Sequence, residues 1–235
     1  MQITPQERLI VALDVDNLKE AARLVNLLID YVTIFKVGAQ LFTAVGNDAV
    51  KMIQDKGGKV FLDLKYYDIP NTVAQATKIV AKMGVFMYTI HTLGGKEMMK
   101  AVVDVISTQH TKPLVIGVSI LTSLNQEGLK DIGITKNLND EVVALAKLAK
   151  SSGLDGIVAS TYEVSEIRNQ CGLDFIIVTP GIRPGGSILD DQKRVATAKE
   201  AIADGADFIV VGRPIIAHQN PAKVANQIIK EMETS

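Results

Sequence analysis

Eight short apolar runs, rich in β-branched residues, recur along the chain and alternate with stretches of helical pattern. Several runs are apolar at consecutive positions, which is typical of strands covered on both faces, as in parallel sheets. The alternation therefore predicts a parallel sheet whose strands are joined by helices. The predicted strands cover residues 9–15, 33–38, 59–65, 85–91, 113–120, 156–160, 175–180 and 208–213.

Helices with one apolar face are predicted between the strands, because apolar residues recur there three or four positions apart. Two start signals support them: Ser160 and Glu163 have the spacing of a capping box, and Asn220 precedes Pro221 as a cap precedes a first-turn proline. The residues that share a face are Leu24, Val25 and Leu28 in the first helix, Leu41, Val45, Ala49 and Met52 in the second, and Val224, Ile228 and Ile229 in the last.

The number of strand–helix units predicts the architecture. Eight units within 235 residues, with no Ser/Gly-rich linker between them, indicate one (β/α)8 TIM barrel that forms a single domain over residues 1–235. An open doubly wound sheet is the main alternative, but it usually has fewer strands, and no G-x-G-x-x-G fingerprint follows the first predicted strand. The connections 123–139 and 183–191 are too long for simple turns, and such loops usually have a functional role.

The composition argues against several classes of partner. Lys and Arg number 25 against 26 Asp and Glu, Trp is absent and aromatic residues make up 5%, so a nucleic-acid partner is not expected. Cys171, the single cysteine, can form neither an intrachain disulfide nor a thiolate metal cage. No apolar run is long enough to span a bilayer and the first residues lack a signal-peptide pattern, so we expect a cytoplasmic protein with no membrane partner.

Charged and histidine side chains fall at the carboxyl ends of the predicted strands, where the active sites of (β/α)8 barrels lie. Asp63 and Lys65 are two positions apart, which on a regular strand places both on one side, about 6.6 Å apart, and that side is expected to be the barrel interior. For any one candidate a structural ion pair is the alternative, and for His91 a structural hydrogen-bonding role is expected. The residues at these ends are Asp14, Lys36, Asp63, Lys65, His91 and Arg213.

Glycine and arginine gather after the seventh and eighth predicted strands, in T-P-G-I-R-P-G-G (179–186) and V-G-R-P (211–214). Barrels of this type often bind phosphate at this place. Gly212 would let a backbone amide approach a phosphate oxygen, and Arg213 offers a planar fork of donors. Either stretch alone could be a Gly/Pro-rich turn beside a surface arginine, but their joint position indicates phosphate binding.

The segment D-L-K-Y-Y-D-I-P-N-T, residues 63–72, resembles the signature of the orotidine 5'-phosphate decarboxylases. The motif D-x-K-x-x-D alone is shared by a wider group of sugar-phosphate barrels, whereas I-P-N-T and the arginine-bearing loops are more specific. Tyr66–Tyr67 departs from the pattern, because many bacterial relatives carry a smaller apolar residue and His there. Further stretches extend the resemblance, to the bacterial branch of the family, over nearly the whole chain: Leu13–Asp14, Phe35–Gly38, Leu121–Ser123, Pro180–Pro184 and Val211–Pro214.

This resemblance implies an enzyme that decarboxylates orotidine 5'-phosphate to uridine 5'-phosphate and CO2, the last step of de novo pyrimidine (UMP) synthesis, without a cofactor or metal. It also implies a homodimer in which Asp68 and Thr72 are donated across the interface. The implied site is the charged array of Lys36, Asp63, Lys65 and Asp68, with Lys65 as proton donor; Asp14, Lys36 and Thr72 at the ribose; Thr122 at the pyrimidine; and Arg183, Gln192, Gly212 and Arg213 at the phosphate.

Two other functions are compatible with part of the pattern. A hexulose- or gulonate-phosphate lyase of the same barrel group would use Mg²⁺ and an enediolate, but I-P-N-T and Lys36 argue against it. A phosphate-binding barrel that has lost catalysis and serves as a scaffold is the alternative from another class. The presence of Lys36, Asp63, Lys65 and Asp68 argues against that scaffold.

Overall fold

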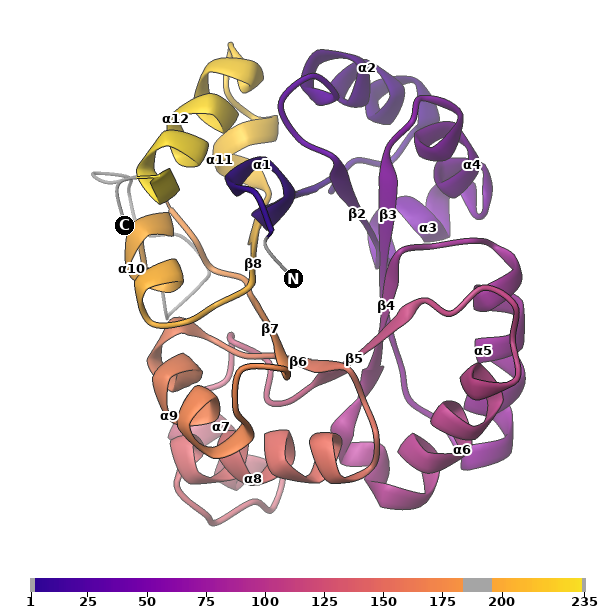
Figure 1. Ribbon diagram of the computed structural model, residues 1–235, viewed down its shortest axis with the longest axis vertical. Helices are drawn as coiled ribbons and strands as arrows, with labels where there is room; N and C mark the ends of the chain where they lie inside the picture. The colour runs from indigo at the N-terminus through magenta and orange to yellow at the C-terminus, as the bar shows by residue number, and fades with distance from the viewer. Residues whose placement is uncertain (1–2, 184–195, 234–235) are drawn as a thin grey trace.

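The computed structural model describes residues 3–183 and 196–233 (Figure 1). Within these residues, eight parallel strands form a closed barrel in chain order, as β1 pairs with both β2 and β8. This confirms the (β/α)8 architecture predicted from the alternating pattern. The strands are β1 (Leu9–Ala12), β2 (Ile34–Gly38), β3 (Lys59–Tyr66), β4 (Met87–His91), β5 (Leu114–Val118), β6 (Gly156–Val158), β7 (Ile176–Thr179) and β8 (Phe208–Val211).

Helices surround the barrel and cover the outer face of its strands (Figure 1). In the described ranges, no helix combines the length and apolar character needed to cross a membrane. The helices are α1 (Pro5–Arg8), α2 (Leu18–Leu28), α3 (Ala39–Val45), α4 (Asp48–Asp55), α5 (Pro70–Lys82), the 3-10 helix η1 (Thr92–Gly94), α6 (Gly95–Ser107), α7 (Gln126–Asp131), α8 (Leu138–Ser151), α9 (Thr161–Cys171), α10 (Ala198–Ala203), α11 (Arg213–Ile216) and α12 (Pro221–Glu233).

The core has two parts, because alternate strand residues point inward and outward. The larger cluster packs outward-facing strand residues against the apolar faces of the helices, including Leu24 and Leu28 of α2. The smaller cluster fills the barrel interior and draws one buried residue from each of seven strands: Ile10, Ile34, Phe61, Met87, Ile116, Val178 and Phe208. Because these side chains fill the barrel interior, they form a packed floor, and a ligand can bind only between this floor and the carboxyl ends of the strands.

The prediction that the second helix is continuous is wrong. Leu41 and Ala49 are buried as expected, but they belong to two helices, α3 and α4. The chain breaks at Gly46, which adopts a φ of 59°, a left-handed conformation that glycine tolerates and that ends α3. The start signals are confirmed: Ser160 and Glu163 form a capping box, and the Asn220 side chain accepts from the Lys223 N–H at 3.1 Å.

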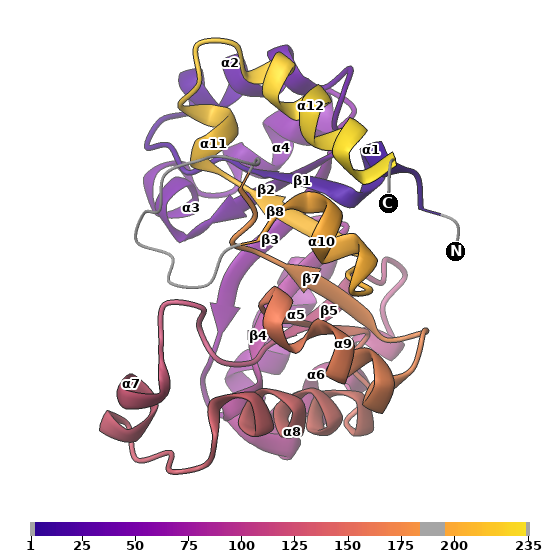
Figure 2. The same cartoon turned by 90° about the vertical axis from the view of Figure 1, so that its left-hand side faces the viewer.

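The two long connections differ in what the structure describes. The one over 123–139 contains the short helix α7, which projects from the barrel on the lower left of Figure 2. Of the connection 183–191, Arg183 is described and the remainder lies outside the described residues. Five strands also end one to three residues earlier than predicted, namely β1, β5, β6, β7 and β8. Asp14 follows β1 instead of ending it, and Arg213 begins α11 instead of ending β8.

Candidate active site

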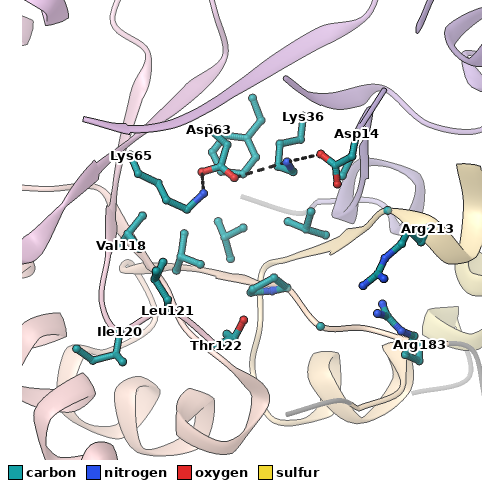
Figure 3. Close-up of a pocket in the computed structure, with 18 residues that line it drawn as sticks. Asp14, Lys36, Asp63, Lys65, Val118, Ile120, Leu121, Thr122, Arg183 and Arg213 are labelled. Atoms are coloured by element: carbon teal, nitrogen blue, oxygen red, sulfur yellow. Dashed lines mark hydrogen bonds and ion pairs between the residues drawn. The ribbon is translucent and has the colours of Figure 1, made fainter. Parts of the chain in front are cut away.

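A cavity of about 330 Å³ opens at the carboxyl ends of the strands, above the packed floor (Figure 3). Its volume is at the lower end of the range of small-molecule sites. Residues from distant parts of the chain meet there because a closed parallel barrel brings all its carboxyl strand ends to one rim. Predicted residues in its lining are Asp14, Lys36, Asp63, Lys65, Thr122, Arg183, Gly212 and Arg213.

One end of this pocket carries a chain of alternating charges (Figure 3). The Nζ of Lys36 lies 3.1 Å from Asp14 Oδ1 and 3.7 Å from Asp63 Oδ2. The other oxygen of Asp63, Oδ1, accepts from Lys65 Nζ at 2.9 Å. Each ammonium thus contacts a carboxylate, and Asp63 is shared between the two lysines. These contacts hold the side chains at defined positions before any ligand enters.

Lys65 reaches this position through an irregular backbone. Its φ is 52°, and it is the one non-glycine residue with positive φ in the part of the chain that the structure describes. The pairing of β3 with β4 shifts register between Leu62 and Tyr66. The expectation of a regular strand from Asp63 to Lys65 is therefore wrong, although the two side chains do meet at the pocket.

Electrostatics favour a charged Asp63 despite its burial. Burial by itself opposes ionisation, but Lys36, Lys65 and the hydroxyl of Thr89 more than offset it, so the pKa of Asp63 is lowered. His91 lies nearby at the end of β4. Burial, and then the charge of Lys65, lower the pKa of His91 and favour its neutral form.

The opposite end of the pocket is cationic. Arg183 follows β7 and Arg213 follows β8, and in Figure 3 their guanidinium groups lie near each other at the cavity edge. Among the described lining residues, four side chains are cationic and two are anionic, which leaves an excess of two positive charges. Such a pocket favours an anionic ligand.

Two glycines lie close to the charged side chains. A Cβ on Gly38 would lie 2.7 Å from Lys36 Nζ, and a Cβ on Gly212 would lie 3.3 Å from Asp14 Oδ2. Distances this short would force the charged side chains to move. A side chain at Gly212 would therefore crowd the Asp14 carboxylate at the rim of the pocket.

Two of the described residues predicted for the site, Asp68 and Thr72, are not in the lining of this pocket. Asp68 and Thr72 are exposed, in the β3–α5 connection and the first turn of α5. Asp68 Oδ1 accepts from the Ile69 N–H at 2.6 Å. Gln192 lies outside the described residues.

The tyrosines that depart from the family pattern lie where β3 ends: Tyr66 is its last residue, and Tyr67 begins the connection to α5. Tyr66 packs edge-on against buried Tyr88, with ring centroids 6.3 Å apart. Tyr67 is 62% exposed and lies over the ring of His91, with centroids 5.6 Å apart. Nδ1 of His91 accepts from the Leu93 N–H at 3.4 Å, so the hydrogen bond expected for His91 is present.

Sequence reasoning missed the apolar wall of the pocket and a buried hydroxyl beneath it. The wall is aliphatic, and a run of β-branched residues carries no signal that distinguishes a pocket wall from a core. The hydroxyl belongs to Thr89 of β4, which bonds to both Asp63 and Lys65. Over residues 3–183 and 196–233, no cluster of three or more His, Cys, Asp or Glu side chains could hold a metal ion. The aliphatic wall residues are Val118, Ile120, Leu121, Val158, Val178 and Val210.

Comparisons with known proteins agree on one family. Residues 7–228 match the family model described as orotidine 5'-phosphate decarboxylase / HUMPS family. The orotidine 5'-phosphate decarboxylase of Geotalea daltonii is 49% identical over 96% of this chain and 95% of its own, and that of Syntrophotalea carbinolica is 47% identical over 99% and 97%. A crystal structure of orotidine 5'-phosphate decarboxylase from Lactobacillus acidophilus is similar with a TM-score of 0.84 and 38% identity, and the match covers 96% of this chain and 99% of that one.

Proposed function

Because the chain belongs to the orotidine 5'-phosphate decarboxylase / HUMPS family, we propose that the pocket at the carboxyl ends of its strands is the site of decarboxylation. The protein converts orotidine 5'-phosphate to uridine 5'-phosphate and CO2, the last step of UMP biosynthesis. The observation that supports this location is the distribution of charge in one cavity: lysines and aspartates occupy one end, and arginines occupy the other. A substrate with a carboxylate at one end and a phosphate at the other fits that division of charge.

The reacting end of the pocket suits the chemistry of this reaction. When the bond from C6 of the pyrimidine to the carboxylate carbon breaks, the electron pair stays on C6 in an orbital that the ring cannot delocalise. A fixed ammonium stabilises that charge in a water-poor site and then supplies a proton to C6. We assign this role to Lys65, whose Nζ is held 2.9 Å from Asp63 Oδ1. No cofactor is needed for this step.

The ribose and the pyrimidine occupy the middle of the cavity in this proposal. Asp14 and Lys36, joined at 3.1 Å, present an acceptor and a donor that suit vicinal hydroxyls. Thr122 lines the pocket from the connection after β5 and offers a hydroxyl to the pyrimidine. The aliphatic wall then covers the ring and excludes water, which strengthens the charged contacts.

The phosphate group occupies the arginine end. A phosphate carries a charge of about −1.5 to −2 at neutral pH, and two guanidinium forks can bind it with several charge-assisted hydrogen bonds. Arg183 and Arg213 line this end, and Gly212 leaves room for a close approach to the backbone. We also assign Gln192 to the phosphate, an assignment that rests only on the resemblance to the family.

A second copy of the chain completes the charged array in this proposal. Asp68 and Thr72 lie on an exposed segment of one chain, so they are available to a neighbouring molecule. Their surroundings are apolar: Tyr67, Ile69 and Ile79 are 62%, 67% and 58% exposed. Ile69, Thr72 and Ile79 are spaced to share one face of α5. Burying such a face between two chains favours a homodimer in which each chain donates Asp68 to the partner's pocket.

Turnover of orotidine 5'-phosphate in the presence of a strong chelator tests the activity and the reaction type together. The expected result is uridine 5'-phosphate at the same rate with and without the chelator. A related lyase would need Mg²⁺, so loss of activity on chelation would favour that alternative. Substrate bound without any product would indicate the scaffold.

A single domain over residues 1–235 is proposed as well, since strands and helices alternate throughout the described ranges. The cytoplasmic location stays a prediction.

A further inference from the structure

Thr89 occupies the centre of β4, next to Asp63 and Lys65 of the charged array. It is fully buried, and it is not among the residues that line the pocket. Its Oγ1 accepts a hydrogen bond from the backbone N–H of Lys65 at 2.9 Å. The same hydroxyl donates to Asp63 Oδ1 at 3.0 Å, the oxygen that also accepts from Lys65 Nζ at 2.9 Å. One hydroxyl therefore ties the backbone of Lys65 to the carboxylate that holds its ammonium.

The register between β3 and β4 explains why this position is special. Leu62 pairs with Tyr88 and Tyr66 pairs with Ile90, so three residues of β3 lie opposite the single residue Thr89. Extra residues in one strand interrupt the ladder and leave backbone groups without a strand partner. The hydroxyl of Thr89 takes the place of that partner for the N–H of Lys65.

The backbone of Lys65 needs such support. A φ of 52° is rarely adopted by residues other than glycine, and it persists only where surrounding contacts hold it. In an ordinary extended conformation the Lys65 side chain would leave the position that it occupies beside Asp63. The left-handed turn therefore decides where the ammonium points.

We propose that Thr89 is a positioning residue for the reaction: its hydroxyl holds Lys65 in the left-handed conformation and aligns Asp63 with the Lys65 ammonium. This inference rests on the proposed function. It predicts that the hydroxyl contributes to the catalytic step while leaving substrate binding nearly unchanged, because Thr89 does not line the cavity.

Thr89→Val tests the proposal, because it removes the hydroxyl and keeps the branched shape. A displacement of a catalytic group by about 1 Å can cost about 100-fold in rate, so kcat is expected to fall by about 100-fold while KM changes little. Thr89→Ser keeps the hydroxyl and is expected to retain most of kcat. If the valine variant does not fold, Thr89→Ala is compared with Thr89→Ser, since these two differ only by the hydroxyl.

The pH profile gives a readout that a merely structural role would not move. The charged groups facing Asp63 are Lys36 from β2 and Lys65 from its own strand, with Asp14 beyond Lys36. These charges remain in Thr89→Val, whereas the hydroxyl that donates to Asp63 is lost. The acid limb of kcat is therefore expected to move to higher pH in the valine variant and to stay in place in Thr89→Ser.

Thr77→Val is the matched control for the loss of a buried hydroxyl. Thr77 is also fully buried, and its Oγ1 lies 3.0 Å from the hydroxyl of Tyr88 on the outer side of the barrel. The Thr77→Val substitution is expected to lower the melting temperature and to leave kcat unchanged. Wild-type kcat in Thr89→Val, or an equal loss of kcat in Thr77→Val or Thr89→Ser, would overturn the inference. An inactive wild-type protein would instead overturn the proposed function.

Discussion

At the β2–β3 end of the pocket both lysines and Asp63 come from strands, and Asp63 contacts each lysine, whereas at the β7–β8 end Arg183 lies in the connection after β7 and Arg213 is the first residue of α11. The first end is fixed by neighbouring strands and by the buried Thr89. The second end offers cations and small residues at the rim. The two ends therefore differ in the elements that supply their charges.

The difference matches two demands of the proposed reaction. Charge that develops only in the transition state is stabilised best by groups that are already in place, because nothing then has to reorganise during the step. A phosphate is charged before and after the reaction, so its binding requires cations at the rim more than a rigid arrangement. We expect substitutions at the first end to affect the chemical step and substitutions at the second end to affect use of the phosphate.

The largest effect is expected at the strand-borne end. Lys65→Ala removes both the stabilising ammonium and the proton donor, so kcat should fall by at least about 10⁴-fold. Asp68→Ala should also be nearly inactive if each chain donates Asp68 to its partner. When the two inactive variants are refolded together, a mixed dimer has one site with both lesions and one site with neither. Activity measured after mixing should recover to about a quarter of the wild-type value for random pairing.

The control for this mixing experiment is each variant refolded alone, which should stay inactive. Formation of the mixed dimer is verified independently, for example with two distinguishable tags. If the mixed dimer forms and remains inactive, Asp68 acts within its own chain or has no role, and the shared site is wrong.

A smaller and more selective effect is expected at the arginine end. Arg213→Ala removes one partner of the phosphate, and kcat/KM for orotidine 5'-phosphate should fall by about 10²- to 10³-fold. The nucleoside orotidine lacks the phosphate, so its much slower turnover should be unchanged by the substitution. Free phosphite should raise turnover of orotidine by the wild type and have little effect on the variant.

Arg23→Ala is the matched control, because Arg23 is an exposed arginine paired with Glu20 at 2.6 Å on α2. It should leave both substrates unaffected. If Arg213→Ala lowers kcat/KM equally for orotidine 5'-phosphate and for orotidine, the two ends of the pocket are not separate in function.

The smallest effect concerns stability in acid. The pKa of Asp63 is lowered below its ordinary value of 3.8 in the folded protein, so its carboxylate stabilises the fold above that value and the stabilisation is lost as the pH falls through the lower, folded pKa. The free energy of unfolding should therefore fall more steeply with acid below about pH 4 in the wild type than in Asp63→Asn. Urea unfolding across this range measures the difference.

Arg213→Gln changes the other end of the pocket and should keep the wild-type acid dependence. Parallel curves for the wild type and Asp63→Asn would contradict the assignment of this acid sensitivity to Asp63.

Much of the pocket could be predicted from strand ends alone. Once the eight strands are ordered, Lys36, Asp63 and Lys65 must approach one rim together with the residues that follow β7 and β8. The pattern could not predict that Gly46 divides the second helix, because apolar spacing continues across the break. It also gave no sign of Thr89, since threonine is an ordinary strand residue.

The order of strands and helices, and the end of the barrel at which charged residues collect, can be predicted from the amino-acid sequence, because both follow from local periodicity and from the parallel topology. The left-handed turn at Lys65 and the sharing of Asp63 between two lysines arise only in the folded chain. These depend on the register between neighbouring strands and on the contacts of a buried side chain. Register is set by packing across the barrel, which no stretch of sequence contains on its own.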